Sequence, residues 1–329
     1  MARNLISDVT GVRVGHAQDE RLASGVTVIL FDEPPTASID VRGGGPGTRE
    51  ADLLDPHMTV QRIQAITLSG GSAFGLDAPS GVQAYLREQG RGFQVGTALV
   101  PIVPGAVLFD LLNDGDKQWG RYPPYRELAY TAATSVAADF ALGSVGAGTG
   151  ATTVNLKGGI GSASAVTADG FTVGALAAVN AVGSVVVGDG PWFWAAPFEQ
   201  EGELGGLGFP ASLPANALDP RGKGAPRMST TLVVVATDAE LTKAQAKRLA
   251  VMAHDGFARA IYPVHTLLDG DVVFAAATGA RPLDEPIFAL MRLGAMAANV
   301  VARAIARGVH TATALPFPKA LPSWRDKFG

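Results

Sequence analysis

Short runs of apolar and β-branched residues recur along the chain, and Gly, Asp or Asn residues separate them. Val, Ile and Thr suit the pleated surface of a sheet, whereas the residues at the boundaries favour turns. The pattern therefore predicts strands at 25–31, 37–41, 65–68, 171–179, 184–187, 231–237 and 272–277.

Helical periodicity fills several of the intervals between these strands. Within 242–260 apolar residues recur on one helical face, and Thr242 followed by Gln245 predicts a capping box at its start. Further helices are expected at 78–89, 126–142 and 286–308, the last opened by an Asp-Glu-Pro segment that supplies an N-cap. Because helices and strands do not alternate strictly, the pattern favours a layered α/β domain over a doubly wound sheet.

The composition narrows the class of protein and its chemistry. None of the 329 residues is Cys, which excludes disulfides, thiolate metal sites and a cysteine nucleophile. Covalent catalysis would need Ser, Thr, Lys or a carboxylate. The five His residues are scattered without a metal-ligand spacing, so no zinc site is expected, and the net charge of −4 predicts no nucleic-acid partner.

Neither a secretory signal nor a membrane span is expected. The N-terminal segment 1–16 has charged residues and no apolar core, and no apolar run approaches the length of a span. These observations predict a cytoplasmic protein without membrane contact. The length alone allows one large domain or two small ones.

Glycine-rich segments give only weak signals. The segment 146–150 reads GxGxG rather than GxGxxG, and Lys157 is followed by Gly, so neither a dinucleotide fingerprint nor a P-loop is present. Ser72 lies in a segment resembling a nucleophile elbow, but Phe74 replaces the expected Gly. We interpret Gly71 and Ser72 as a tight strand-to-helix turn whose backbone N–H groups face a ligand.

Two Asp-Gly-Asp segments, 114–116 and 269–271, have a spacing that is typical of turns. The second directly precedes a predicted strand. If it is extended, Asp269 and Asp271 point to one face, where two carboxylates shift each other's pKa and can share a proton or hold a cation.

A long stretch without clear periodicity, 188–227, is separated from Thr230 by only two residues. Thr230 then begins a strongly apolar strand. A Thr in that position is ordinarily only a strand former. The same position suits a self-cleaving precursor, in which the hydroxyl attacks the carbonyl of Ser229. The freed α-amine would then act as the general base for the hydroxyl.

Several segments in order resemble the family of self-processing hydrolases that contains the L-aminopeptidase/D-esterase, the β-peptidyl aminopeptidases and the nylon-oligomer endohydrolase. The resemblance covers almost the whole chain. Its segments are 6–16, 40–44, 68–75, 103–106, 156–159, 178–180, 229–231 with 236–238, and 265–271.

The resemblance implies a single α/β domain, 1–329, folded as a four-layer α-β-β-α sandwich. It implies self-cleavage between Ser229 and Thr230 into an α chain of residues 1–229 and a β chain of residues 230–329. It further implies a homotetramer, no cofactor and a small peptide or amide substrate. The implied catalytic residues are Thr230 as nucleophile, Asn180 as oxyanion donor, Asp269 and Asp271 as orienting acids, and Lys157 as electrostatic support.

Two positions depart from the family pattern. Phe109 stands where the family has an active-site Tyr, and Val107 stands where aminopeptidase members have a Glu that binds the substrate's amine. Both differences favour an amide without a free amine at that point. We expect Val107 and Phe109, together with Ser72 and Gly71, to form the wall of the substrate-binding site.

These features predict an amidohydrolase acting on small peptides or oligoamides. Three alternatives remain open: an aminopeptidase acting on amino-acid amides, esters or β-peptides, an acyltransferase, and an unprocessed binding protein that has lost the chemistry.

Overall fold

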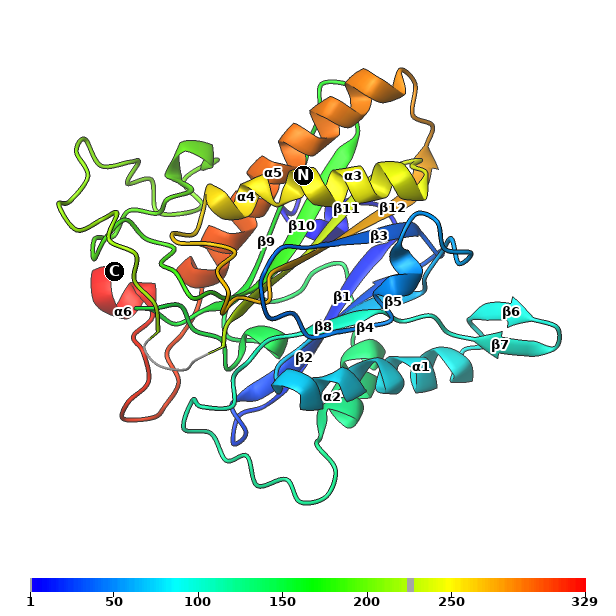
Figure 1. Ribbon diagram of the computed structural model, residues 1–329, viewed down its shortest axis with the longest axis horizontal. Helices are drawn as coiled ribbons and strands as arrows, with labels where there is room; N and C mark the ends of the chain where they lie inside the picture. Colours follow the sequence, from blue (N-terminus) through cyan, green and yellow to red (C-terminus); the bar gives the residue numbers. More distant parts are fainter. Residues whose placement is uncertain (1, 224–227) are drawn as a thin grey trace.

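The computed structural model describes residues 2–223 and 228–329. Two five-stranded sheets face each other at its centre (Figure 1). The first has the order β1 (Val12–Asp19), β2 (Ser24–Phe31), β5 (Ala65–Ser69), β8 (Gly105–Val107) and β4 (Thr48–Arg49). The second has the order β3 (Thr36–Val41), β12 (Val272–Arg281), β11 (Thr230–Ala239), β10 (Thr172–Asn180) and β9 (Gly159–Val166).

Helices cover the outer face of each sheet (Figure 1). The first sheet carries α1 (Ala78–Glu88) and α2 (Tyr125–Thr134). The second carries α3 (Lys243–Ala253), α4 (Asp255–Ala258) and α5 (Pro286–His310), while the short α6 (Trp324–Phe328) lies beside the far end of α5.

Strand β11 shows why the sequence folds into layers. Leu232 and Val234 point into the apolar layer between the two sheets, whereas Val233 and Val235 point towards the helices. All of these positions are fully buried, because a strand inside a covered sheet has apolar neighbours on both faces. A third apolar layer lies between the first sheet and α1 and α2. The expected four-layer α-β-β-α sandwich is therefore confirmed.

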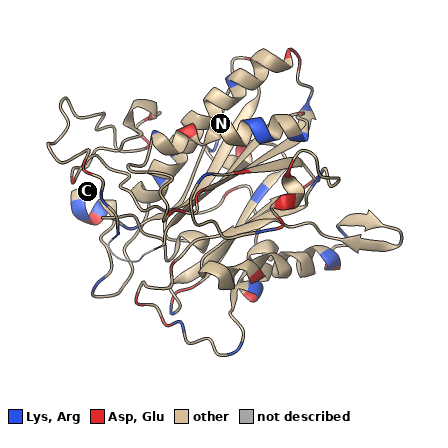
Figure 2. Cartoon of the chain, viewed as in Figure 1, with Lys and Arg blue, Asp and Glu red and all other residues tan. Residues whose placement is uncertain are grey.

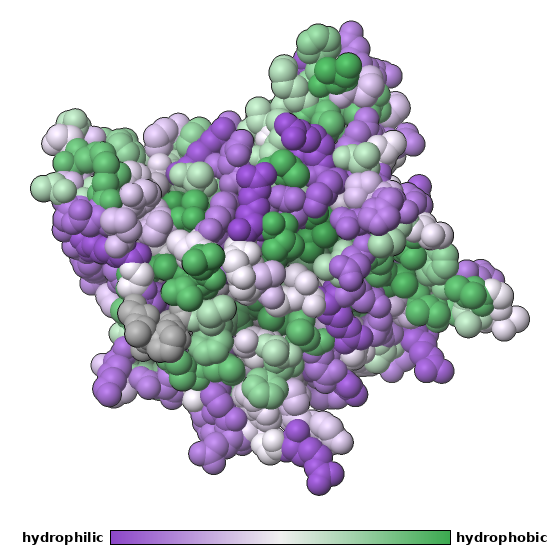
Figure 3. All heavy atoms as spheres, viewed as in Figure 1, coloured by the Kyte–Doolittle hydropathy of each residue, from purple (hydrophilic) through white to green (hydrophobic). Residues whose placement is uncertain are grey.

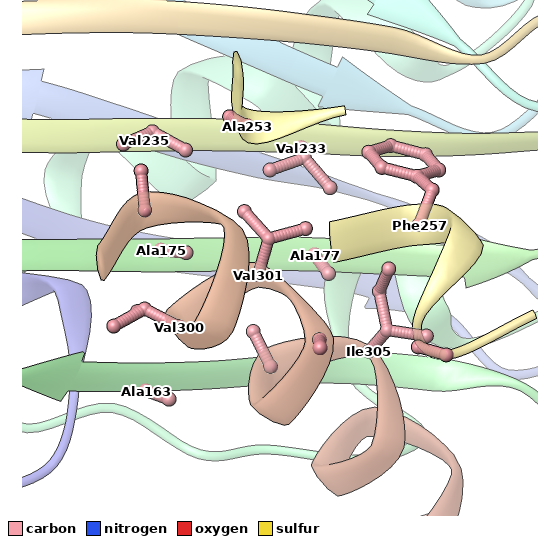
Figure 4. Packing of buried hydrophobic residues seen from close by; sticks show 14 of the residues in the cluster. Ala163, Ala175, Ala177, Val233, Val235, Ala253, Phe257, Val300, Val301 and Ile305 are labelled. Atoms are coloured by element: carbon pink, nitrogen blue, oxygen red, sulfur yellow. The ribbon is translucent and has the colours of Figure 1, made fainter. Parts of the chain in front are cut away.

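Figure 4 shows the layer under α5. Val300, Val301 and Ile305 of the helix pack against small side chains on the strands, including Ala175 and Ala177. Small residues on the sheet allow the helix to approach closely. Helix α5 is long and apolar enough to cross a membrane, but 56% of its most apolar window is buried inside the molecule, as in a core helix.

Most predicted elements are present, but several differ in their bounds or pairing. The helix expected at 126–142 ends at Thr134, because Ala137 exchanges backbone hydrogen bonds with Val14 on the edge of the first sheet. The helix expected at 242–260 has its capping box but is divided into α3 and α4 at His254. The strand expected at 184–187 makes only isolated bridges to Tyr262 and Phe193.

The start of α5 differs in detail from the expectation. Its N-cap is Glu285, in a left-handed conformation with φ of 50° and no side-chain cap, rather than Asp284. The pattern also left β1 and β9 unpredicted. Strand β9 is rich in Gly, Ala and Ser, so its extended form depends on its partners β10 and α5 rather than on propensity.

The surface of the described residues has two notable properties. Positive and negative side chains are interspersed over the elements (Figure 2). The hairpin of β6 (Phe93–Val95) and β7 (Ala98–Val100) projects from the body and exposes apolar side chains (Figures 1 and 3).

Candidate active site

Thr230 is the first residue of β11, a strand in the middle of the second sheet. It lies directly opposite Asn180, the last residue of the antiparallel neighbour β10. Thr230 is only 4% exposed. The structure thus brings together, at one end of the sheet, the predicted nucleophile and the predicted oxyanion donor.

The peptide group before Thr230 is held from both sides. The Thr230 hydroxyl donates to the Ser229 carbonyl oxygen at 2.6 Å, and the backbone N–H of Gly270 donates to the same oxygen at 2.8 Å. A donor that polarises a carbonyl beside a hydroxyl favours attack of that hydroxyl on the carbonyl carbon. A side chain at position 270 would collide, since a Cβ there would lie 2.6 Å from the Thr230 Oγ1.

The two predicted carboxylates lie next to this peptide but have different partners. Asp271 is 1% exposed, and its Oδ1 accepts the backbone N–H of Thr231 at 2.8 Å. Asp269 accepts the N–H of Val182 at 3.1 Å and the Thr266 N–H and hydroxyl at 2.9 Å and 2.8 Å. Asp271 therefore positions the start of β11, and Asp269 joins its own loop, at Thr266, to the loop after β10, at Val182.

The electrostatics of Asp271 follow from its burial. Desolvation raises the pKa of its carboxyl, and the nearby Asp269 charge acts in the same direction. Hydrogen bonds from His265 and Thr231 oppose this rise. Among the described residues, no cluster of His, Asp and Glu has the arrangement of a metal site.

Asn180 is held by the loops around it. Its Nδ2 donates to the Phe109 carbonyl at 3.0 Å, and its Oδ1 accepts the Thr152 N–H at 3.0 Å and the Lys223 Nζ at 3.1 Å. The amide orientation is thus determined by its partners. One of its two N–H groups is engaged by Phe109, which leaves the second for an oxyanion.

Lys157 is 1% exposed and donates to the carbonyl oxygens of Gly148, Ala151 and Gly158 at 2.8 to 2.9 Å. Burial lowers its pKa to about 7, while the charge of Asp110 acts in the opposite direction. The three carbonyl acceptors match the three donors of an ammonium group. Lys157 is therefore only partly protonated near neutral pH, and it lies beside the site rather than in the wall in front of Thr230.

A cavity of about 390 Å³ opens in front of Thr230. Val107, Phe109 and Ser72 line it, together with Met228 and Leu76. None of its lining residues in the described regions of the chain is charged. A neighbouring cavity of about 250 Å³ shares Phe109 and Met228 with it and is lined by Lys157, Lys223 and Lys319 as well as Asp110 and Asp114.

Gly71 lies away from this wall. Its N–H donates to Asp110 at 2.7 Å, and its φ of 83° places it where a Cβ would lie 2.1 Å from the Tyr125 ring. The Ser72 N–H donates to the Leu108 carbonyl at 2.9 Å. The interpretation that both N–H groups face a ligand was therefore wrong, because Asp110 and Leu108 use them.

The sequence reasoning missed Gly270, His265 and Asp110. Gly270 and His265 stand within the segment 265–271 that carried some of the resemblance, so the signal was present but no role was assigned. Asp110 is fully buried and accepts the Ser24 hydroxyl at 2.6 Å. Desolvation raises the pKa of its carboxyl. No spacing pattern distinguished it from a loop acid.

Comparison with known protein families identifies the family of this chain. The model of Peptidase family S58 matches residues 4–320, so the chain belongs to this peptidase family. Membership places it among hydrolases that act on peptide bonds, and the fold resemblance inferred from sequence is confirmed.

Individual relatives agree with this assignment. An uncharacterized aminopeptidase of Mycobacterium tuberculosis is 42% identical over 99% of this chain and 98% of its own length. The 6-aminohexanoate-oligomer endohydrolase of Kocuria is 27% identical over 82% of this chain and 74% of its own length.

Solved structures share the fold. The β-aminopeptidase of Burkholderia superposes with a TM-score of 0.73 at 23% identity and covers 99% of this chain and 93% of its own. The L-aminopeptidase D-Ala-esterase/amidase of Ochrobactrum anthropi, a variant of the Ntn-hydrolase fold, has a TM-score of 0.72 at 22% identity and covers 98% and 91%.

Proposed function

We propose that this protein is a self-processing amidohydrolase that cleaves its own chain between Ser229 and Thr230 and then uses Thr230 as an N-terminal nucleophile. The observation that carries the proposal is the Ser229 carbonyl, whose oxygen accepts both the Thr230 hydroxyl and the Gly270 N–H. The Gly270 N–H bond belongs to the parallel bridge between Ser229 and Asp269, whereas the Thr230 hydroxyl is an additional donor that this bridge does not require.

Self-cleavage would proceed in two steps. The Thr230 Oγ attacks the Ser229 carbonyl carbon, the peptide C–N bond breaks, and the hydroxyl proton ends on the Thr230 nitrogen. Water then hydrolyses the resulting ester, which leaves a carboxylate on Ser229 and a free α-amine on Thr230. The Gly270 N–H stabilises the oxyanion in both steps.

The processed enzyme would repeat this chemistry on a substrate. The α-amine takes the hydroxyl proton, Oγ forms an ester with the substrate's acyl group, and the amine product leaves with that proton. Water then hydrolyses the ester, which releases the acid and restores the Thr230 hydroxyl. Asn180 provides the second N–H as an oxyanion donor, Asp271 holds the Thr231 amide, and Lys157, in the wall of the neighbouring cavity, stabilises negative charge at a distance.

The cavity in front of Thr230 supports small peptides or oligoamides as substrates. Its wall carries Val107 and Phe109 and no charged residue in the described regions of the chain, so it suits an apolar acyl group. The aminopeptidase alternative is favoured by a different observation, since the relative at 42% identity is named an aminopeptidase. Matched amides with a free and an acetylated amine distinguish the two.

Intact mass spectrometry of the purified protein tests the proposal. We expect two chains, 1–229 and 230–329, in the wild type. Thr230→Ala should remain one intact chain without amidase activity, because no hydroxyl remains, whereas Thr230→Ser should be cleaved. A wild-type chain that stays intact after long incubation, and behaves like Thr230→Ala, contradicts the proposal and favours the binding-protein alternative.

A further inference from the structure

His265 lies between the predicted catalytic machinery and a second, buried histidine. Its Nδ1 lies 2.9 Å from Oδ2 of Asp271, and its backbone N–H donates to the same oxygen at 3.3 Å. Its ring contacts His254 edge to face, with 4.9 Å between ring centroids, and packs against Phe257 at 5.2 Å. Because a carboxylate only accepts, the contact assigns the Nδ1 proton to His265.

The carboxyl of Asp271 divides its two oxygens between two partners. Oδ1 accepts the N–H of Thr231, and both hydrogen bonds to Oδ2 come from His265. Thr231 follows Thr230 directly. The Asp271 carboxyl therefore links His265, through hydrogen bonds, to the backbone N–H of the residue that follows the predicted nucleophile.

This carboxyl is costly to keep ionised. Asp271 is buried, which raises its pKa, and the Asp269 charge raises it further. The His265 hydrogen bond is the largest of the effects that lower it. Removing that donor therefore shifts Asp271 towards the neutral acid, which binds the Thr231 N–H less strongly.

His254 and Asp40, on the other side of His265, have partners of their own and do not bind Asp271. His254 is fully buried at its side chain, and burial lowers its pKa to about 4, so it is neutral near pH 7. Its Nε2 lies 3.1 Å from the Asp40 carbonyl oxygen. The Asp40 carboxylate is engaged by Arg42 and Lys247 at 3.1 Å and 3.0 Å.

The backbone at His265 is in the left-handed region, with φ of 53°. Residues other than Gly adopt this region uncommonly, although Asn, Asp and His do so more often than the rest. The His265 Nε2 is buried without a hydrogen-bond partner among the described residues.

We propose that His265 is a positioning residue that keeps Asp271 ionised and so holds the Thr231 amide, and with it Thr230, in place for attack. The inference rests on the proposed function. It adds His265 to the proposed catalytic machinery, although His265 contacts neither the scissile peptide nor the substrate cavity.

Two variants test this role. His265→Ala removes the donor. His265→Asn keeps an N–H donor near the position of Nδ1 and tolerates the left-handed backbone. We expect His265→Ala to slow self-cleavage about tenfold at neutral pH and to move the acidic limb of its pH–rate profile upward by about one pH unit. His265→Asn should restore most of both.

A second measurement separates this inference from the proposed function. In the Thr230→Ala background, which cannot cleave, carboxyl-carbon NMR follows the titration of Asp271, identified by its loss in Asp271→Asn. We expect His265→Ala to raise the titration midpoint and His265→Asn to leave it nearly unchanged. An unchanged midpoint in His265→Ala overturns the inference, even if the wild type processes itself. A raised midpoint supports the link to Asp271 even if the wild type proves not to cleave.

A purely structural role predicts a different outcome. Both variants would then lose rate equally at every pH, with no displacement of the acidic limb and no rescue by His265→Asn. If His265→Ala fails to fold, as judged by circular dichroism, the comparison of His265→Asn with His265→Gln decides the question. Gln carries its donor one bond further out, so it should resemble a missing donor.

Discussion

Among the described contacts, the Lys157 ammonium donates hydrogen bonds to backbone carbonyls, and the charge of Asp110 also favours its protonated form. Its ammonium donates to three carbonyl oxygens, and burial lowers its pKa from 10.5 to about 7. The folded chain therefore binds fewer protons at Lys157 than the unfolded chain does between these two pH values. It follows that Lys157 makes the protein more stable as the pH rises through this window.

We expect Lys157→Met to remove this dependence. In the uncleavable Thr230→Ala background, urea unfolding should show the chain with Lys157 gaining stability over the Met variant, by about 1 kcal/mol per pH unit between about pH 7.5 and 9.5. Parallel stability profiles for the two chains would show that burial does not perturb this lysine.

Sequence reasoning located the catalytic candidates better than their partners. The sequence segments around Thr230, Asp269 and Asp271 predicted these residues as catalytic candidates, and the fold brings them together. The partners of Asn180 were not predictable, because Phe109 and Thr152 reach it only through tertiary packing of distant loops. The N–H groups of Gly71 and Ser72 were misassigned for the same reason.

At the scale of elements, α5 and β9 approach each other through glycines. A Cβ on Gly161 would lie 1.9 Å from the Ala304 carbonyl oxygen and 2.3 Å from the Gly308 nitrogen. Both are backbone atoms, so no side-chain rotation can relieve the collision. The helix must therefore move away from the sheet if position 161 gains a side chain.

We expect Gly161→Ala to reduce the free energy of unfolding by about 3 kcal/mol or more, measured by urea unfolding in the Thr230→Ala background. Gly222→Ala is the matched control, since within residues 2–223 and 228–329 a Cβ there meets only a methyl group of Val182 at 3.5 Å. Equal stabilities of the two variants would contradict the close approach of α5.

Elements with strong periodicity were predictable, and those that depend on pairing were not. The capping box at Thr242 and the apolar strands β11 and β12 follow local rules. The segment after Thr134 has helical composition, yet it pairs with the edge of β1 because Val14 has backbone groups to satisfy there. Local propensity carries no information about such a partner.

At the scale of the whole molecule, the proposed cleavage leaves two chains that are interleaved. The β chain, 230–329, contributes β11 and β12, and these strands lie between β3 and β10, both from the α chain, 1–229. The two chains therefore share the second sheet, and hydrogen bonds cross between them on both sides of the β11–β12 pair.

We expect the processed protein to elute as a single species in gel filtration, with both chains present in equal amounts, and to separate only in denaturant. Light scattering on the same column tests the homotetramer that the resemblance predicts. A free 230–329 chain under native conditions would contradict the interleaved arrangement.

The position of Gly270 also sets the timing of the proposed reaction. The donor that holds the Ser229 carbonyl belongs to a segment synthesised after the bond itself, and it reaches that bond only when β12 has paired with β11. A ribosome-bound or half-folded chain lacks this contact. Maturation would thereby report that folding is finished, so a misfolded copy would remain uncut and inactive.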